Sequence, residues 1–306
     1  MFRFFSIKSQ LFTVKIVMSK HLIAKPIIKK TLKNLKEKRA ALEIRGLNPK
    51  MSVILVGDNQ ASLSYIKNKK RMCQKIGADF NLIELDKDIS EDEFLKSINE
   101  QNNDESVTGC FVQLPIPNHL GHLDTATLVS PEKDVDGFHS KTSISLYRNQ
   151  ECNLIPCTPK GIVKMLKFYD IPIEGQDITI IGRSFIVGRP LNLLLSNLNA
   201  TVTLCHSKSK NIKDHCKRAD IIISAVGNPK YLDKSYISTT KAQTLIDVGI
   251  NRDINGELCG DMDFENLDGI VDAITPVPGS VGPMTVLSLM ENLIKATDGI
   301  LNRRKK

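Results

Sequence analysis

Several features that would point to other classes of protein are scarce or missing in this sequence. There is no tryptophan and there are only five tyrosines among 306 residues, so aromatic side chains that could stack on nucleic-acid bases are few. The seven cysteines are odd in number and form no C-x-x-C pair, which favours reduced thiols and argues against a structural zinc site. No apolar run approaches the roughly 18 residues of a membrane span. We therefore expect no bound metal and no membrane partner.

The formal net charge of +8 is unevenly distributed along the chain. Residues 1–50 carry +11 and residues 303–306 carry +4, so the rest of the chain is net negative. A nucleic-acid groove needs basic residues gathered on one folded face together with stacking aromatic residues. We interpret the basic ends as solvated and expect no nucleic-acid partner. Binding of nucleic acid or another anionic surface by these ends is the alternative.

The first seventeen residues have a composition of their own. The segment M-F-R-F-F-S-I-K-S-Q-L-F-T-V-K-I-V has three basic residues, no acidic residue and no small-residue cleavage signature. It fits an upstream extension ahead of a start at Met18, or a weak organellar presequence. We prefer the extension, and hence a cytoplasmic protein, with a mitochondrial location as the alternative.

The first half of the chain alternates short apolar runs with helical patterns. Apolar residues recur at three- and four-residue steps over 26–45, which predicts an amphipathic helix. Strands and helices are then predicted, in order, at 51–57, 61–76, 80–85, 90–100 and 110–114. Strands that alternate with helices indicate a parallel α/β architecture.

A polar, irregular stretch at 137–155 separates this half from a second α/β pattern. Pro159 lies near the first turn of the next predicted helix, so we place a domain boundary before residue 156. Four apolar strands follow, at 177–182, 201–205, 220–227 and 244–249. They predict a doubly wound, Rossmann-type parallel sheet. We expect two domains, 18–155 and 156–284, with a cleft between them and a last helix, 285–306, that packs back on the first.

The segment I-T-I-I-G-R-S-F-I-V-G-R-P runs from a strand into a helix. Gly182 ends the β-branched strand and Gly188 brackets the turn. Glycine lets the backbone approach a pyrophosphate, and a helix start offers free N–H donors. The spacing is not G-x-G-x-x-G, so it indicates either nucleotide binding or a plain strand-to-helix turn.

The end of the next strand bears on the choice of cofactor. Domains that bind NAD usually place an acidic residue there to accept from the ribose hydroxyls. Here the strand T-V-T-L-C is followed by His206, Ser207 and Lys208, and Arg183 lies beside the glycine turn. A hydroxyl and cations suit a ribose phosphate, which favours NADP over NAD, unless these residues simply begin a solvated loop.

A lysine cluster occupies the predicted helix of the first domain. Tyr65 and Lys69 are four residues apart in Y-I-K-N-K-K-R and share one helix face. We expect like charge on Lys67, Lys70 and Arg71 to lower the pKa of Lys69 and so to ease proton transfer. The cluster could equally be a solvated helix face.

Three further signals lie at strand and helix ends. Gln113 follows a strand at the carboxyl edge where ligands of parallel sheets bind. Lys133, Asp134 and Asp136 form a polar turn that is either a solvated loop or an anchor for an amino-bearing heterocycle. The Pro- and Gly-rich segment 274–285 suits a wall close to a flat ligand.

Taken in order, these segments resemble a known family. The motifs are Y-x-x-x-K, V-Q-L-P, K-D-V-D-G-F, P-C-T-P-K-G, G-R-S-x-x-V-G, A-T-V-T-x-C-H-S-K, D-V-G-I-N and T-P-V-P-G-x-V-G-P-M-T. From about residue 19 to 296 they are similar to the bifunctional methylenetetrahydrofolate dehydrogenase/methenyltetrahydrofolate cyclohydrolase family. The resemblance implies NADP-dependent oxidation of methylenetetrahydrofolate, hydrolysis of the methenyl product in the same cleft, and a homodimer.

The resemblance also implies roles for particular residues. Lys69 would assist water attack and shuttle the proton, Gln113 would hold that lysine, and Asp136 would anchor the pterin. The other implied folate contacts are Tyr65, Val112, Leu114, Pro278, Gly279, Ser280, Val281 and Gly282. The implied NADP contacts are Gly182, Arg183, Ser184 and Ser207.

Four positions depart from the family pattern. Phe185 and Ser280 stand where the family commonly has Asn and Gly, and Thr142 and Ile144 stand where it often has Asn and Gly. The last two bear on folate-tail or interdomain packing. Phe185 raises the alternative of a chain that retains only the cyclohydrolase, with an impaired nucleotide site.

Overall fold

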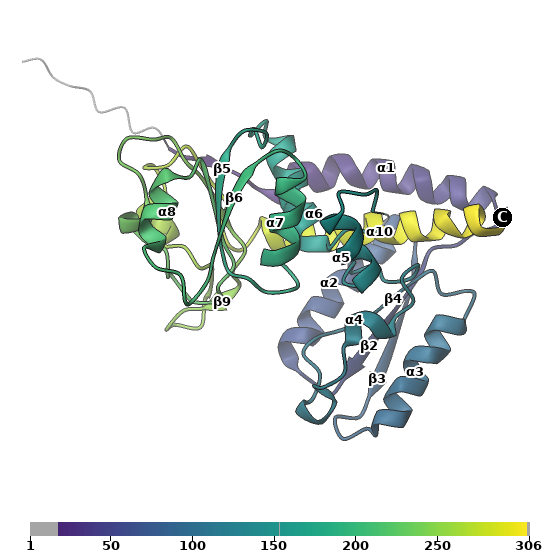
Figure 1. The fold of residues 1–306 in the computed structure, drawn as a ribbon. Helices are drawn as coiled ribbons and strands as arrows, with labels where there is room; N and C mark the ends of the chain where they lie inside the picture. The colour runs from purple at the N-terminus through teal and green to yellow at the C-terminus, as the bar shows by residue number, and fades with distance from the viewer. Residues whose placement is uncertain (1–17, 153, 305–306) are drawn as a thin grey trace, which may run out of the picture.

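The computed structural model describes residues 18–152 and 154–304. Two parallel sheets form separate lobes that are joined by long helices (Figure 1). This arrangement confirms the predicted α/β fold with a Rossmann-type parallel sheet. The expectations for residues 1–17 and for Lys305 and Lys306 lie outside the described residues.

The smaller lobe is built on a three-stranded parallel sheet in the order β3-β2-β4. Its strands are β2 (Lys50–Val56), β3 (Asp79–Leu85) and β4 (Gly109–Val112). Its helices are α2 (Gln60–Ile76), α3 (Glu91–Asn103), η1 (Asn118–Leu120) and α4 (Thr125–Leu128). Each long element lies within a few residues of its predicted range.

Local signals fix the ends of α2 and α3. The Asn59 side chain caps α2 by accepting from the backbone N–H of Ser62, and Gly77 ends the helix in the left-handed region at φ 75°. The Ser90 side chain caps α3 by accepting from the backbone N–H of Glu93 at 3.3 Å, and its hydroxyl donates to the Glu93 carboxylate at 2.7 Å. These caps satisfy backbone groups at the helix ends and so fix where the helices begin and end.

The larger lobe contains a six-stranded parallel sheet in the order β1-β11-β8-β7-β5-β6. Its strands are β1 (Lys20–His21), β5 (Asp177–Ile181), β6 (Thr201–Cys205), β7 (Ile221–Ser224), β8 (Thr244–Asp247) and β11 (Ala273–Ile274). Four of these strands were predicted. β1 and β11 have two residues each, too few to show any periodicity, and β1 comes from the segment assigned to the first domain.

Short helices and a hairpin complete this lobe. They are α6 (Cys157–Phe168), α7 (Gly188–Ser196), α8 (Ile212–Arg218), η2 (Lys234–Tyr236), α9 (Phe264–Leu267) and the antiparallel pair β9 (Asn251–Arg252) and β10 (Leu258–Cys259). The predicted turn into α7 and the helix after Pro156 are both present.

One prediction for the connecting segment is wrong. The stretch 137–155 was expected to be irregular, but it contains the helix α5 (Ser140–Tyr147). Its sequence shows no clear apolar period, and only Thr142 and Leu146 are buried in it. Tertiary contacts hold this helix, because it packs on α7 and Asn197 donates to the carbonyl of Leu146 at 2.8 Å.

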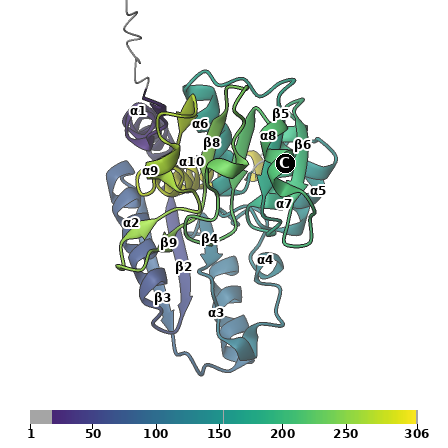
Figure 2. The same ribbon diagram turned by 90° about the vertical axis from the view of Figure 1, so that its left-hand side faces the viewer.

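Two long helices connect the lobes. α1 (Ala24–Ile44) and α10 (Val281–Arg304) lie side by side (Figure 1 and Figure 2). α10 also packs on α6, α2 and β4, as predicted for the last helix, although it begins four residues earlier than expected. Asn292 of α10 donates to the carbonyls of Val135 and Ile155, at 2.8 Å each, and so fixes the connection between the lobes.

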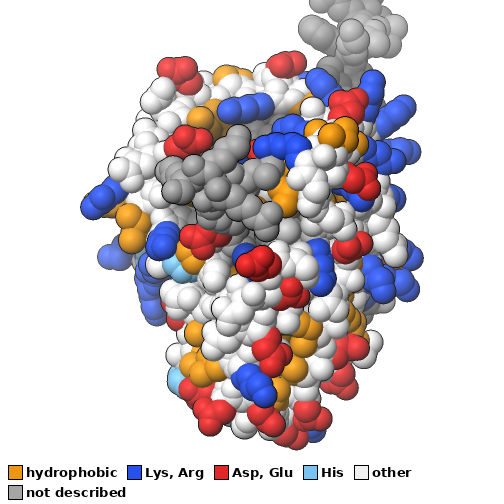
Figure 3. All heavy atoms as spheres, turned by 90° about the vertical axis from the view of Figure 1, so that its right-hand side faces the viewer, with side chains coloured by type: hydrophobic (Ala, Val, Ile, Leu, Met, Phe, Trp, Pro, Cys, Tyr) orange, Lys and Arg blue, Asp and Glu red, His pale blue; other side chains and the backbone are white. Residues whose placement is uncertain are grey.

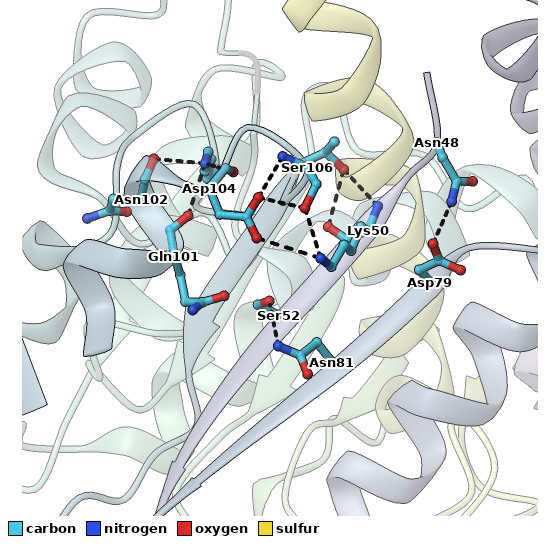
Figure 4. A network of polar contacts seen from close by, with 11 residues as sticks. Asn48, Lys50, Ser52, Asp79, Asn81, Gln101, Asn102, Asp104 and Ser106 are labelled. Carbon is cyan, nitrogen blue, oxygen red and sulfur yellow. Dashed lines mark hydrogen bonds and ion pairs between the residues drawn. The ribbon is translucent and has the colours of Figure 1, made fainter. Parts of the chain in front are cut away.

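A polar network closes the amino end of the smaller sheet (Figure 4). Lys50 donates to Ser106 at 2.8 Å and lies 3.6 Å from the carboxylate of Asp104. Lys133 caps α3 by donating to the carbonyls of Gln101, Asn102 and Asp104. These polar groups satisfy one another at the amino end of the sheet.

The charge is segregated on the surface as well as along the chain. In Figure 3, acidic side chains gather over the lower part of the face shown, and basic ones follow an upper edge. The first turn of α3 carries three acidic residues. The exposed lysines of α1 are Lys25, Lys29, Lys30, Lys33, Lys36 and Lys38.

Candidate active site

The buried pair Lys69 and Gln113 lies at the carboxyl edge of the smaller sheet. Lys69 reaches in from α2, is 6% exposed, and donates to Oε1 of Gln113 at 3.1 Å. Gln113 in turn donates through Nε2 to the Leu114 carbonyl at 2.9 Å, which fixes its amide so that the oxygen faces the lysine. The structure therefore joins two residues that are 44 positions apart in the sequence.

An aromatic ring completes the surroundings of this amine. Nζ of Lys69 lies 3.9 Å from the centre of the Phe111 ring. The predicted crowding by Lys67, Lys70 and Arg71 is not what the structure shows, because these three side chains are exposed whereas Lys69 is buried. Helix periodicity turns them away from the sheet. The environment of the amine is thus set by Gln113, Phe111 and the nearby Asp136.

The polar turn 133–136 divides its three charged residues among different tasks. Asp134 is buried and accepts from the backbone N–H groups of Gly137 and His139, at 3.1 and 2.7 Å, so it shapes the turn. Burial raises the pKa of Asp134 to about 7. Burial also raises the pKa of Asp136, while the positive charge of Lys69 lowers it. The turn is not a solvated loop, because Lys133 and Asp134 hold the local structure; Asp136 faces a cavity, and its role as an anchor for a heterocycle stays a prediction.

Asp136 lines a small cavity next to the lysine. The cavity holds about 20 Å³ and its walls include Val112 and Leu114, which flank Gln113. Phe138, two residues after Asp136, and Phe185 of the larger lobe also line it, with their ring centres 5.4 Å apart. Three of the predicted folate-site residues, Val112, Leu114 and Asp136, therefore share one cavity.

A much larger cavity is lined by residues of both lobes, and neither Lys69 nor Gln113 is among its lining residues. It holds about 900 Å³ and contains Tyr65 on one wall. The opposite wall includes the predicted residues Pro278, Gly279, Ser280, Val281 and Gly282. A Cβ placed on Gly282 would lie 3.7 Å from the Tyr65 hydroxyl, so the two walls face each other at close range.

The wall 278–282 is held by its own backbone and by α10. The Ser280 side chain is buried and donates to the Pro276 carbonyl at 2.8 Å, rather than facing the cavity. Gly279 adopts φ 126°, where a side chain would be strained. Val281 and Gly282 belong to the first turn of α10 and not to the preceding loop.

Two buried carboxylates that were not predicted from the sequence lie at this cavity: Asp247 lines it, and Asp261 holds the lining residue Asn251. Asp261 accepts from the backbone N–H groups of Val226 and Asn228, at 2.7 and 3.0 Å, and from the Asn251 side chain at 2.9 Å. Asp247 accepts from three backbone N–H groups and lines the cavity. Asp247 belongs to the motif D-V-G-I-N, but nothing local in the sequence links it to Asp261.

The glycine turn after β5 forms a cradle. A Cβ on Gly182 would overlap the Ala225 carbonyl, and one on Gly188 would overlap the Gly182 carbonyl. The Ser184 hydroxyl accepts from the N–H of Val187 at 3.2 Å and so shapes the turn. Arg183 is exposed beside it.

The end of β6 lies next to this cradle. Ile181 pairs with Cys205, and the Gly182 N–H donates to the Cys205 carbonyl at 2.9 Å. Ser207 and Lys208 follow after His206, and both residues are exposed. The four predicted nucleotide contacts, Gly182, Arg183, Ser184 and Ser207, therefore lie on two adjacent strand ends.

The described residues add two negative findings. No helix within 18–152 or 154–304 is long and apolar enough to cross a membrane. Over the same ranges, no group of three or more His, Cys, Asp or Glu residues is placed to hold a metal ion.

Comparison with known sequences identifies both lobes. Residues 22–136 match the family described as tetrahydrofolate dehydrogenase/cyclohydrolase, catalytic domain, and residues 156–300 match its NAD(P)-binding domain. The chain is 49% identical over 259 residues to the bifunctional protein FolD of Oceanobacillus iheyensis, covering 85% of this chain and 90% of that one. It is 43% identical over 280 residues to the bifunctional protein FolD of Staphylococcus haemolyticus, covering 92% and 97%.

Solved structures agree with this assignment. The bifunctional methylenetetrahydrofolate dehydrogenase/cyclohydrolase of Campylobacter jejuni is 40% identical, with a TM-score of 0.88 over 92% of this chain and 99% of that one. The Trypanosoma brucei enzyme, solved with NADP and an inhibitor, is 29% identical, with a TM-score of 0.87 over 93% and 99%. The resemblance found from the motifs is confirmed, and the chain belongs to the tetrahydrofolate dehydrogenase/cyclohydrolase family.

Proposed function

We propose that this chain oxidises methylenetetrahydrofolate with NADP and then hydrolyses the methenyl product to formyltetrahydrofolate in a single cleft. The observation that carries the proposal is the buried Lys69–Gln113 pair, which lies beside Asp136 at the carboxyl edge of the smaller sheet. It provides one amine and one carboxylate where the two lobes meet. The enzyme is bifunctional, as its relatives are named.

The residues around the glycine turn fit a dinucleotide phosphate. Gly182 and Gly188 let the turn pack tightly on the Ala225 and Gly182 carbonyls, which places the start of α7, with its free N–H groups, directly after β5. Arg183, Ser207 and Lys208 offer exposed cations and a hydroxyl for the ribose phosphate. When bound, NADP supplies the acceptor for the hydride.

In the oxidation, the main task of the protein is positioning. The substrate carbon lies between two nitrogens, whose lone pairs stabilise the cation left when hydride departs, so no acid or base is required. We assign Asp136 to hold the amino-bearing pterin ring, with Val112 and Leu114 as the apolar walls of its pocket. Tyr65 and residues 278–282 confine the next ring of the folate between the facing walls of the large cavity.

In the hydrolysis, a proton must move. Water adds to the carbon of the methenyl cation and loses a proton, and one carbon–nitrogen bond then breaks to leave the formyl group. Lys69 is the group placed to accept and return that proton, and Gln113 orients its Nζ through the 3.1 Å hydrogen bond. Asp136 lies near this amine and balances its charge.

The division of labour between the domains is part of the proposal. Residues 18–155 with the last helix would bind folate, and residues 156–284 would bind NADP. The matched ranges and the two sheets support this division. A homodimer and a cytoplasmic location are proposed from the family and from its bacterial members, and light scattering of the purified chain tests the first.

A paired assay tests the function. Purified protein is given methylenetetrahydrofolate with either NADP or NAD, and formation of the reduced cofactor and loss of methenyltetrahydrofolate are both followed. We expect both activities, with NADP preferred. Hydrolysis without any cofactor reduction would instead support the cyclohydrolase-only alternative, which the match of residues 156–300 to the NAD(P)-binding domain does not favour.

A further inference from the structure

A buried asparagine of α10 lies between a lysine of α6 and the turn that carries Asp136. Asn292 is 0% exposed, and its Nδ2 donates to the carbonyls of Val135 and Ile155 at 2.8 Å each. Its Oδ1 accepts from Nζ of Lys160 at 2.8 Å. An ammonium group can only donate, so it fixes which end of the amide is the oxygen. Both N–H donors of the amide are thereby turned towards the two carbonyls.

The peptide groups on both sides of Asp136 are held by α6 and α10. The Val135 carbonyl accepts from Asn292 and from the Cys157 thiol, the latter at 3.3 Å. The Asp136 carbonyl accepts from the backbone N–H of Cys157 at 3.2 Å. Because peptide groups are planar, fixing the two planes that flank a residue fixes its φ and ψ. The direction in which the Asp136 side chain leaves the backbone therefore depends on these contacts.

The segment on the other side of this turn is packed just as closely. Gly137 adopts φ 80°, and a Cβ placed on it would lie 2.7 Å from the carbonyl carbon of Ile155 and from the nitrogen of Pro156. The backbone of the turn thus rests directly on residues 155–156. A displacement of either carbonyl that Asn292 holds would be transmitted to the residue between them in space, Asp136.

Two lysines of α6 share one carboxylate of α10 but differ in this contact. Nζ of Lys160 lies 3.6 Å from the Glu291 carboxylate, and Lys164, one turn further on, donates to the same group. The two lysine side chains are similarly exposed, at 22% and 28%. Of the two, Lys160 is the one that also donates to Asn292. The pair therefore separates the effect of the ion pair from the effect of the amide contact.

We propose that Lys160 and Asn292 are positioning residues of the folate site, which orient Asp136 for the pterin ring. Neither is among the described lining residues of the two cavities, so they act through the turn and not on the substrate. The inference deepens the proposed function and rests on it for the role of Asp136. It also gives a task to the lysine of the motif P-C-T-P-K-G.

The variant Lys160→Met should weaken folate binding without slowing the chemistry. A side chain of similar length remains, but the Asn292 oxygen loses its donor and the amide can reverse. Asp136 then holds the pterin less well in the ground state and the transition state alike. The Michaelis constant for methenyltetrahydrofolate should rise about three- to tenfold with kcat near the wild-type value. The Michaelis constant for NADP should not change, and Lys160→Arg, which keeps a charged donor, should restore most of the loss.

The matched control is Lys164→Met, which removes the same charge and an ion pair with the same Glu291 but leaves the donor to Asn292 in place. Its Michaelis constants should equal those of the wild type. Hydrogen exchange of peptides that cover residues 133–139 gives a second readout, which does not depend on turnover. Exchange there should be faster in Lys160→Met than in Lys164→Met or the wild type.

The outcomes distinguish this inference from the function beneath it. Equal rises of the folate constant in Lys160→Met and Lys164→Met would assign the effect to the ion pair with Glu291 and overturn the inference. An unchanged folate constant and unchanged exchange in Lys160→Met would also overturn it. A parallel fall in kcat and rise in the constants for folate and NADP would show a general structural loss instead of positioning. If the wild type turns over neither folate while exchange responds as expected, the proposed function fails and the hold of Lys160 on the turn stands.

Discussion

The ring of Phe185 meets the ring of Phe138 edge to face, with the ring centres 5.4 Å apart. Phe185 belongs to the turn after β5 in the larger lobe, and Phe138 follows Asp136 by two residues. Both rings line the small cavity that contains Asp136. The pair therefore connects the proposed nucleotide loop directly to the proposed pterin pocket.

Phe185→Ala should weaken the dehydrogenase more than the cyclohydrolase. Loss of an aromatic pair costs about 0.5–1.5 kcal/mol, so the Michaelis constant for NADP should rise about two- to tenfold as the loop loses its contact with Phe138. Steady-state kinetics of both reactions measure the change.

The control for this change lies on the same turn. Ile186 is also exposed and does not line the small cavity, so Ile186→Ala should leave the ratio of the two activities near that of the wild type. If Phe185→Ala lowers both activities equally, the ring pair has no special link to the nucleotide loop.

Lys69→Met should separate the two reactions. Removing the proton-transfer group should lower the cyclohydrolase rate by about 10²- to 10⁴-fold, while hydride transfer, which needs no base, persists in part. Lys70→Met, one residue along and exposed, should have little effect. Equal loss of both activities in Lys69→Met would refute the division of roles, because it would point to collapse of the shared pocket.

Arg183→Ala tests how the enzyme selects its cofactor. The exposed guanidinium beside the glycine cradle is assigned to the ribose phosphate, which NAD lacks. A hydrogen bond to a charged group contributes about 1.5–3 kcal/mol, so the Michaelis constant for NADP should rise about tenfold or more. The constant for NAD should change little, and a parallel rise in both would contradict the assignment.

The stability of the fold should depend on pH through Asp134. Burial raises the pKa of this carboxyl to about 7, whereas an unfolded aspartate titrates near 3.9. The native state binds the proton more tightly, so the contribution to stability is fully present below about pH 4 and is lost as the pH rises through about 7. The free energy of unfolding in urea, measured at several pH values, should fall over this range.

The variant Asp134→Asn provides the comparison. Asparagine does not titrate, so the slope of unfolding free energy against pH between about 4 and 7 should be shallower than in the wild type. An unchanged slope would mean that Asp134 is ionised in the folded protein. Asp247, whose pKa burial also raises to about 7, remains in both proteins and contributes equally to each.

Local sequence signals were enough for the elements that carry the candidate site. The alternation of apolar strands with helical stretches predicted α2, and the β-branched run before Gly182 predicted β5. Lys69 and Gln113 could both be selected because one lies on a helix face and the other at a strand end. Residue spacing alone did not predict that the side chains of Lys69 and Gln113 are in contact; the resemblance to the family did.

Tertiary packing decides the features that were missed. α5 forms because α7 covers it, and β1 exists only through its pairing with β11. Lys69 is buried whereas Lys67 and Lys70 are exposed, and this difference depends on which face of α2 packs on the sheet. Asp261 holds the lining residue Asn251 and backbone groups of distant loops, and no pattern in a single sequence encodes those contacts.

The pairing of β1 with β11 has a consequence for how the molecule can move and be divided. The polypeptide passes between the lobes at three places. The first lies between β1 and α1, and the second is the 137–156 connection, to which Asn292 is hydrogen-bonded. The third is where β11 leads into α10. These three covalent connections limit how far the two lobes can separate. Dividing the chain before residue 156 would separate β11 from its partner strand β1. It would also separate residues 18–155 from the helix α10. We therefore expect neither fragment to fold on its own.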